Sequence, residues 1–437
     1  MYFEYVLKGQ TIERRTFVAL KHTSIPHVRN HHFRHSFSSD LTAGIIVAIL
    51  FIPQSMAYAN LAGVNPVYGL YAAITSLLIY TLLGSSKFLS VGPTSIISLI
   101  AFAGVFSIAK PQSLHFFEAM VQLTLLVGII QILLGIFHVG KLFNYIPKHV
   151  ISGFISAAAV IIILHQIDVL LGIERITQTN VLNYMSKLFT NLPSIHPVTS
   201  LIGIGSIIIL IILKRTTSIS PGPILLVFLF PIINKMFLLP YHTAIVGFIP
   251  NGVPEFILPK INLEDMKALI PTAFIIAFIS FLESYAIAHS IAEKENQLIH
   301  PNREMTALGS ANISSAFVGS IPVAGALSRT AVNYQSGAQT KLANIISMFM
   351  ILTTLLFFTS IFYYLPLATL AAVIIVSVYP LINFKRMIIL LKNKPLDGFS
   401  LLITFICTLF VGMIQGFIIG LTLATISSLI QLNRVKN

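Results

Sequence analysis

The chain has 437 residues, of which 56% are hydrophobic and only 9% are charged, and its mean hydropathy is +0.88. A soluble domain carries about 25% charged residues, so this composition excludes a soluble globule, an intrinsically disordered chain and a coiled coil. The formal net charge of +13 is typical of the Lys and Arg excess in cytoplasmic loops, whereas a nucleic-acid partner would need a basic, solvated domain. The composition therefore predicts a polytopic membrane protein.

The first 39 residues are polar and basic, which predicts a cytoplasmic arm (residues 1–39) and no signal peptide. A charged arm also explains a group of histidines better than a metal site does: His22, His27, His31, His32 and His35. Cys407 is the single cysteine, so neither an intrachain disulfide nor a cysteine-based metal site is expected. The sequence has no Walker loop and no nucleophile motif, so we expect no cofactor, no metal and no enzyme activity.

Long apolar segments follow one another between residues 40 and 432, and a helix of about 20 apolar residues can span the membrane. Full spans are expected at 40–60, 66–84, 118–137, 149–170, 198–213, 223–239, 270–291, 342–363, 366–383, 399–413 and 414–432. Weaker segments lie at 93–108, 304–319 and 322–336. The sequence therefore predicts an all-α polytopic membrane protein with about fourteen segments, followed by a cytoplasmic stub at 433–437.

The Lys and Arg residues test this count, because cytoplasmic loops carry an excess of both. With a cytoplasmic N-terminus and alternating sides, 20 of them fall in the cytoplasm and 6 outside, and Arg329 lies inside a segment. A miscount by one segment would mix the two groups. The bias therefore predicts a multi-pass protein of the cell membrane with both termini in the cytoplasm.

Two of the weak segments have the composition of half-helices. Each opens with a proline, Pro93 or Pro322, which suits the first turn of a helix because no N–H is needed there. The shift along the chain that carries Pro93 onto Pro322 also carries Gln54 onto Glu283. Because segments three and ten then match across two halves of seven segments, the pattern predicts an inverted repeat with a site near the membrane midplane.

Two half-helices that face each other with their N-termini create an anion site, because each end carries about half a positive charge and unpaired N–H groups. The hydroxyls of Thr94, Ser95 and Ser328 would add donors. Arg329, expected about two turns into segment ten, would raise the electrostatic potential at the site, since a cation within the membrane needs a cavity or a counter-ion. The alternatives are small residues that serve helix packing and, for Arg329, a structural ion pair with Glu283 or snorkelling to the cytoplasmic side.

Glu283 is the single acid near the middle of an expected span. A low dielectric favours the neutral carboxyl and a nearby Arg favours the ionised one, so such a group can exchange a proton as access alternates. Protonation would relieve the repulsion of an incoming anion, which predicts proton–anion symport, and the alternative is a structural acid. Gln54 and Tyr58 lie one helical turn apart and would line the same pocket.

Several stretches closely resemble the sulfate permease (SulP) family of anion transporters. They are DLTAG (40–44), PQSMAYA (53–59), PVYGLY (66–71), VGPT (91–94), ESYAIA (283–288) and LSRTAVN (327–333). The resemblance covers residues 40–432 and implies a homodimer in which a core domain moves like an elevator against a gate domain. The core would comprise segments 1–4 and 8–11 (about 40–137 and 270–363), and the gate segments 5–7 and 12–14 (about 149–239 and 366–432).

The family's pocket lies between segments 1, 3, 8 and 10. The resemblance therefore implies a substrate site made of Gln54, Tyr58, Thr94, Ser328 and Arg329, with Ser95 and Leu327 as their neighbours. Proton-coupled sulfate carriers of the family have an acid where Glu283 stands.

Two departures from the family pattern bear on regulation and substrate. The chain ends at Asn437 without the cytoplasmic STAS domain that most members have, and Ala324 and Ala326 stand where sulfate carriers often have hydroxyls. The resemblance implies proton-coupled sulfate symport. The alternatives are a sodium-coupled bicarbonate carrier, an exchanger of chloride, bicarbonate or dicarboxylates, and a passive anion channel, whereas Arg329 in place of a second acid argues against a nucleobase carrier.

Overall fold

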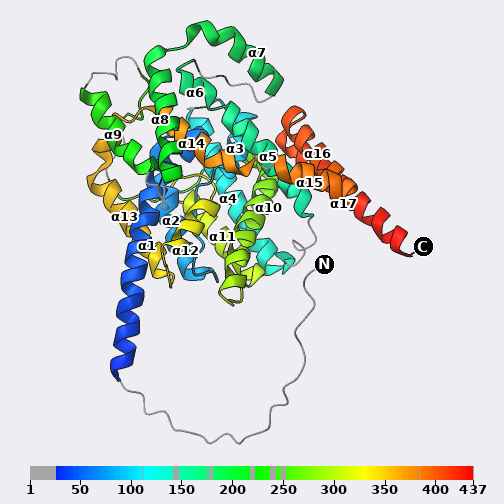
Figure 1. The fold of residues 1–437 in the computed structure, drawn as a ribbon, viewed down its shortest axis with the longest axis horizontal. Helices are drawn as coiled ribbons and strands as arrows, with labels where there is room; N and C mark the ends of the chain where they lie inside the picture. Colours follow the sequence, from blue (N-terminus) through cyan, green and yellow to red (C-terminus); the bar gives the residue numbers. More distant parts are fainter. Residues whose placement is uncertain are drawn as a thin grey trace, which may run out of the picture.

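The structure, a computed structural model, describes residues 26–111, 113–140, 147–174, 176, 181–216, 222–236, 243–247, 252–382 and 384–436. Residues 1–25 of the expected arm, with His22, and Asn437 of the expected stub lie outside the described residues. The described chain is mostly helical, as Figure 1 shows. Its helices are α1 (Pro26–Leu61), α2 (Pro66–Leu83), α3 (Ser95–Phe106), α4 (Leu114–Ile136), α5 (Lys148–Leu164), α6 (Ile167–Leu171), α7 (Val181–Asn191), α8 (Pro197–Thr216), α9 (Gly222–Met236), α10 (Leu263–Lys294), α11 (Pro301–Ala316), α12 (Leu327–Gln335), α13 (Leu342–Phe357), α14 (Leu367–Val378), α15 (Phe384–Asn393), α16 (Pro395–Phe410) and α17 (Met413–Lys436).

Within the described residues, 6 helical stretches are long and apolar enough to cross a membrane alone, and a pair bent by 119° that includes α7 and α8 would make 7. Shorter apolar helices include α3, α13 and α16. Every segment expected from the sequence coincides with a helix, which confirms a mostly helical multi-span membrane protein. Fourteen crossings go beyond what helix length alone supports, because several of these helices are shorter than a bilayer is thick.

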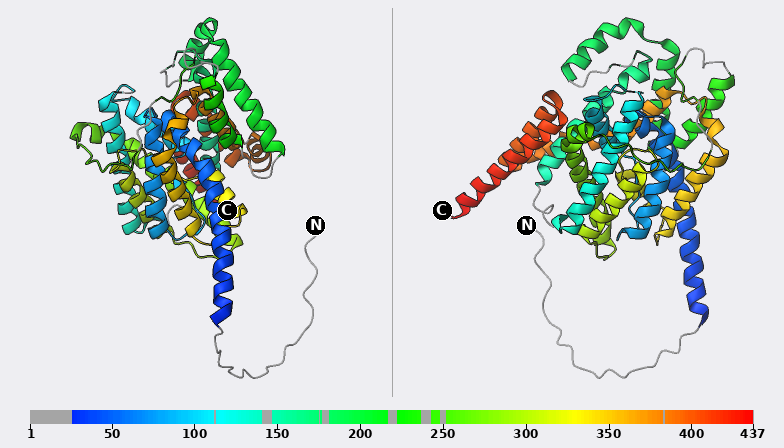
Figure 2. Two further views of the ribbon diagram at one scale, coloured as in Figure 1. Left: turned by 90° about the vertical axis from the view of Figure 1, so that its left-hand side faces the viewer. Right: turned by 180° about the vertical axis from the view of Figure 1, so that it is seen from behind.

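The first helix is longer than its apolar segment. It begins at Pro26 rather than near residue 40, so the described part of the expected arm is helical, and this end of α1 projects from the bundle (Figure 2). Proline is favoured at the first helical position, and neither Gly nor Pro occurs between Pro26 and Gly44 to end the helix. Hydropathy located the start of the apolar segment, but the helical hydrogen bonding of α1 begins before that point.

Two short extended segments replace regular helix in the middle of the molecule. They are strand β1 (Val91–Gly92) and strand β2 (Ala324–Gly325), and each runs into a short helix, α3 or α12. The prediction that a proline opens both helices is wrong: Pro93 precedes Thr94, the N-cap of α3, and after Pro322 the extended backbone continues through β2 until α12 begins at Leu327. Arg329 consequently lies in the first turn of α12 and not about two turns into it. The single shift that aligned Pro93 with Pro322 therefore does not align the two helix starts.

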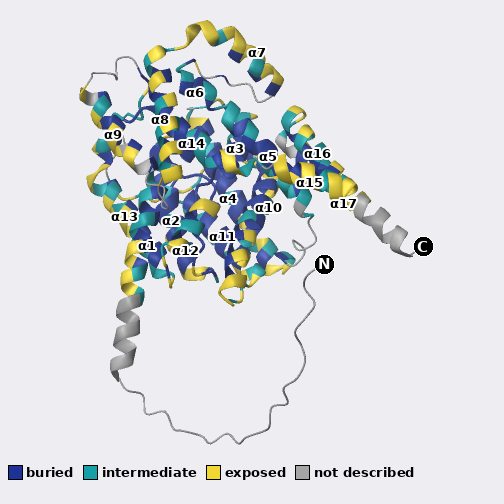
Figure 3. Ribbon diagram, viewed as in Figure 1, coloured by how far each residue is buried: buried dark blue, intermediate teal, exposed yellow. Residues whose placement is uncertain are grey.

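Helices α4 and α11 pack closely in the buried interior, which Figure 3 shows in dark blue. A Cβ atom on Gly128 would lie 2.8 Å from the carbonyl oxygen of Gly309, and a Cβ atom on Gly309 would lie 2.8 Å from that of Gly128. Each glycine thus admits the backbone of the other helix, as small residues commonly do in membrane bundles.

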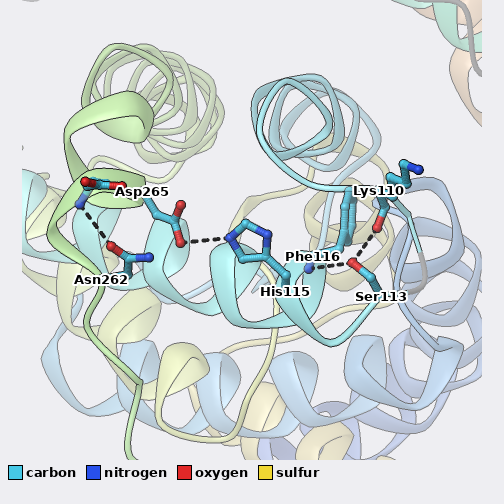
Figure 4. A network of polar contacts seen from close by, with 7 residues as sticks. Lys110, Ser113, His115, Phe116, Asn262 and Asp265 are labelled. Carbon is cyan, nitrogen blue, oxygen red and sulfur yellow. Dashed lines mark hydrogen bonds and ion pairs between the residues drawn. The ribbon is translucent and has the colours of Figure 1, made fainter.

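Polar side chains join the N-terminal ends of α4 and α10 (Figure 4). His115 Nε2 lies 3.0 Å from Asp265 Oδ2. Ser113 Oγ accepts from the N–H of Phe116, and Asn262 Oδ1 accepts from the N–H of Glu264, each at 3.0 Å. Both helices therefore begin with a side-chain cap, which satisfies part of the unpaired N–H groups of the first turn.

The glycine contact predicts a clear loss of stability on substitution. Gly309→Ala should lower the free energy of unfolding by about 1–3 kcal/mol, because the added methyl group would meet backbone and the helices would have to separate. Thermal unfolding of the purified protein in detergent measures this. Gly205→Ala is the matched control, since nothing lies within 4 Å of a Cβ atom at that helical position. A melting temperature for Gly309→Ala equal to that of the control would contradict the packing argument.

Candidate functional site

The two extended segments cross in the middle of the bundle and pair with each other. β1 and β2 are antiparallel, with Val91 opposite Gly325 and Gly92 opposite Ala324. The N–H of Ala326 donates to the carbonyl oxygen of Ser90 at 3.1 Å. Because α3 and α12 each begin within three residues of these strands, the pairing brings the N-termini of both helices together.

Neither of these two helices begins with a side-chain cap. Thr94 stands at the N-cap of α3 in an extended conformation, and its side chain makes no capping hydrogen bond. Ala326 stands at the N-cap of α12 and has no polar side chain. The first-turn N–H groups of both helices are therefore left without side-chain acceptors, in contrast to those of α4 and α10, and such helix ends favour an anion.

A cavity of about 270 Å³ lies at these helix ends. Four helices, α1, α3, α10 and α12, supply most of its polar lining groups. Helices α8 and α14 and the 3₁₀ turn η5 (Tyr379–Leu381) supply lining residues that are apolar apart from Ser377. The polar side chains at the cavity are Gln54, Tyr58, Thr94, Ser95, Glu283, Ser328 and Ser377.

The structure brings most of the residues named from the sequence to this one cavity. Gln54, Tyr58, Thr94, Ser95, Glu283, Leu327 and Ser328 all line it. These residues come from both halves of the chain. The helices around the two strands bring them together at the cavity.

Arg329 lies behind the cavity wall and is fully buried. Its guanidinium donates to the carbonyl oxygen of Pro93 at 2.9 Å and to Gln54 Oε1 at 3.4 Å, and it stacks over the ring of Phe51 at 4.0 Å. Among the described residues, no ion pair within 4.0 Å joins Arg329 to Glu283. The arginine therefore contributes charge at the start of α3 through a hydrogen bond to its backbone, without lining the cavity itself.

Two acids with different surroundings lie near the core. Glu304, on α11, is fully buried and accepts hydrogen bonds from the hydroxyl of Tyr80 (2.6 Å), and from the N–H (2.6 Å) and the hydroxyl (2.7 Å) of Ser85. Glu283, on α10, lines the cavity, and its Oε2 atom has no hydrogen-bond partner. Glu304 is thus held as a structural acid, whereas Glu283 has an oxygen available for a proton.

Sequence reasoning missed the residues that α8 and α14 contribute. Leu210, Val373, Val376 and Ser377 line the cavity. In the sequence these positions look like any apolar membrane segment, and the one signal is the serine near the end of α14. Among the described residues no three His, Cys, Asp or Glu side chains are grouped as a metal site would require.

Comparison with known proteins identifies the relatives of the chain. The model of the sulfate permease family matches residues 37–404. The probable sulfate transporter 4.2 of Arabidopsis thaliana is 34% identical over 401 residues, which are 90% of this chain and 59% of that protein. The putative sulfate transporter YvdB of Bacillus subtilis is 30% identical over 393 residues, which are 89% of this chain and 73% of that protein. The chain thus spans about three fifths of the length of its plant relatives.

Solved structures share the fold. The structure of SLC26A9 superposes with a TM-score of 0.86 at 23% identity and covers 93% of this chain and 67% of that chain. The transmembrane domain of the cyanobacterial bicarbonate transporter BicA superposes with a TM-score of 0.77 at 22% identity, over 87% of this chain and 97% of that domain. The bundle around the two crossed strands therefore matches the transmembrane fold of these proteins.

The family match over most of the chain, the sequence relatives and the shared fold agree with the resemblance seen in the motifs around the cavity. The chain belongs to the sulfate permease family, and it shares the transmembrane fold of the solved structures.

Proposed function

We propose that the chain is a secondary active transporter that carries sulfate together with protons. The observation that carries the proposal is a cavity at which two uncapped helix N-termini meet beside a single acid, Glu283. The helix ends attract an anion, and the acid can hold the proton that accompanies it. Sulfate is the substrate named for the relatives from Arabidopsis and Bacillus, which supports the choice of anion.

The proposal includes fourteen segments in two inverted halves of seven. The antiparallel pairing of β1 with β2 supports it, since two halves related by a two-fold axis in the membrane plane would bring equivalent strands together in opposite directions. Gln54 on α1 and Glu283 on α10, from the first segments of the two proposed halves, both line the cavity. Both termini would then lie in the cytoplasm, and the protein would be a homodimer of the cell membrane, as the family resemblance implies.

The lining of the cavity supports an elevator mechanism. In the proposed core domain, α1, α3, α10 and α12 supply the groups that bind an anion. In the proposed gate domain, α8 and α14 supply Leu210, Val373 and Val376. An apolar surface forms few hydrogen bonds that would have to break, so a core loaded with its anion can slide along it.

The substrate and the coupling ion are tested together in proteoliposomes. We expect radiolabelled sulfate to accumulate when an inward proton gradient is imposed, and bicarbonate, chloride and fumarate to accumulate less. Replacing sodium with potassium should leave uptake unchanged. Bicarbonate uptake that requires sodium would favour the sodium-coupled carrier, counterflow without any gradient dependence would favour an exchanger, and flux that no gradient can concentrate would favour a channel.

Glu283→Gln should abolish proton-driven sulfate accumulation but retain exchange of internal for external sulfate, because the amide keeps the shape of the side chain and cannot take up a proton. Glu293→Gln is the matched control, an acid on the same helix whose side chain is 71% exposed. Accumulation of sulfate by Glu283→Gln at the control's level under the same gradient would refute the coupling role.

Arg329→Ala should raise the KM for sulfate about tenfold or more, because removal of a buried cation lowers the potential at the start of α3. Arg329→Lys keeps the charge without the planar guanidinium and should give an intermediate KM. Arg303→Ala is the control, since its guanidinium also donates to a backbone carbonyl, that of Leu83 at 2.8 Å, but is exposed to solvent. A KM for Arg329→Ala within a factor of two of the control would exclude the electrostatic role.

A further inference from the structure

The paired strands leave two open edges in the interior of a membrane protein. Every backbone N–H and carbonyl group there needs a partner, because no water is available from the lipid. On the β1 edge, the hydroxyl of Ser76 donates to Val91 O and the amide of Asn344 donates to Leu89 O, each at 3.0 Å. On the β2 edge, Ser284 Oγ accepts from the N–H of Gly325 at 2.7 Å. Side chains of the surrounding helices thus stand in for neighbouring strands.

Asn312, on α11, completes the β2 edge with an acceptor and a donor from one side chain. Its Oδ1 accepts from the N–H of Val323 at 2.8 Å, and its Nδ2 donates to the carbonyl oxygen of the same residue at 3.3 Å. An amide that bonds both backbone groups of one residue fixes that residue in two directions. Val323 directly precedes β2, so Asn312 holds the strand that leads into α12.

Gln131, on α4, determines which way the Asn312 amide points. Its Oε1 accepts from Asn312 Nδ2 at 2.9 Å, and Leu308 O accepts from the same nitrogen at 3.1 Å. A flipped Asn312 would point its oxygen at three acceptors, so one orientation is favoured. The side chains of Gln131 and Asn312 are both fully buried.

The same glutamine also holds the helix that carries the acid. Gln131 Nε2 donates to Ser280 Oγ at 2.8 Å and to Ala277 O at 3.3 Å, both on α10. One turn further on, Ser284 bonds β2 directly and is the chain neighbour of Glu283. The Gln131–Asn312 pair therefore connects α10, which carries Glu283, to β2, which sets the position of the α12 N-terminus.

We propose that Asn312, oriented by Gln131, is a positioning residue for the anion site. It touches neither the cavity nor an anion, and it acts by holding the N-terminus of α12 at a fixed distance from Glu283. This inference rests on the proposed function, because a fixed separation between the helix end and the acid matters only if both act on one substrate. Helix-end N–H groups and an acid are sensitive to placement, since misplacement by about 1 Å can weaken such a site up to a hundredfold.

A buried amide can also serve stability alone, and a second asparagine provides the comparison. Asn234, on α9, is equally buried, and its Nδ2 donates to Tyr364 O at 2.7 Å. It does not line the cavity. Asn312→Ala removes three hydrogen bonds to backbone and one to Gln131, whereas Asn234→Ala removes one to backbone, so both substitutions should lower the melting temperature and Asn312→Ala should lower it further. A change in sulfate affinity is expected for Asn312 alone.

The experiment compares Asn312→Ala, Gln131→Ala, the double variant and Asn234→Ala in proteoliposomes, with the KM and maximal rate of sulfate uptake and the melting temperature as readouts. We expect Asn312→Ala to raise the KM for sulfate about tenfold, Gln131→Ala to raise it less, and Asn234→Ala to leave it within a factor of two. The double variant should resemble Asn312→Ala, because the two residues act as one unit. Size-exclusion chromatography selects folded protein, and Gln131→Ala carries the comparison where Asn312→Ala does not fold.

Two outcomes would overturn the inference alone. In the first, wild-type protein transports sulfate and Asn312→Ala, or Gln131→Ala in its place, shifts the KM no more than Asn234→Ala does. In the second, the effects of the two single substitutions on the KM add in full in the double variant. A folded wild-type protein that takes up none of sulfate, bicarbonate, chloride and fumarate would overturn the proposed function, and the inference with it.

Discussion

Two extended segments, β1 and β2, cross and pair inside the membrane bundle. Extended backbone at this depth has polar groups on both edges, and lipid offers them no partner. Each strand supplies hydrogen-bond partners along one edge of the other, as in the bond from Ala326 N–H to Ser90 O. Side chains such as Ser76 and Asn312 satisfy the outer edges. Several buried polar side chains of this apolar chain therefore hold a few residues of extended backbone in place.

The N-termini of α3 and α12 follow from this arrangement. A chain that leaves an extended segment and enters a helix must leave its first N–H groups unpaired unless a side chain caps them. Helices α4 and α10 have such caps, from Ser113 and Asn262, whereas α5, α11 and α14 also begin without one. At the crossing, Thr94 makes no capping bond and Ala326 cannot make one. The extended backbone, which costs stability at this depth, thus leads to two positive helix ends at one cavity. Arg329 adds its charge behind these helix ends.

Sequence reasoning reached the helices and most of the cavity, because apolar segments, charge bias and short motifs are local properties. Gln54, Thr94 and Glu283 were found in this way, and all three line the cavity. Sequence reasoning failed where tertiary contacts determine the local structure. Pro322 suggested a helix start, but the pairing of Ala324 and Gly325 with β1 keeps the chain extended as far as Ala326. The contribution of α14 was invisible, since Val373 and Val376 are indistinguishable in sequence from lipid-facing residues.

The two sets of helices that line the cavity differ in polarity, and this difference suits the proposed elevator movement. If both proposed domains supplied polar lining groups, the anion would bind to the core and to the gate. Sliding would then break its bonds to one of the two domains. Here α1, α3, α10 and α12 supply most of the polar lining groups, whereas α8 and α14 supply Leu210, Val373 and Val376 together with the polar Ser377. Rigid positioning is then required only among the polar lining groups of α1, α3, α10 and α12. The pair Gln131 and Asn312 lies behind these groups.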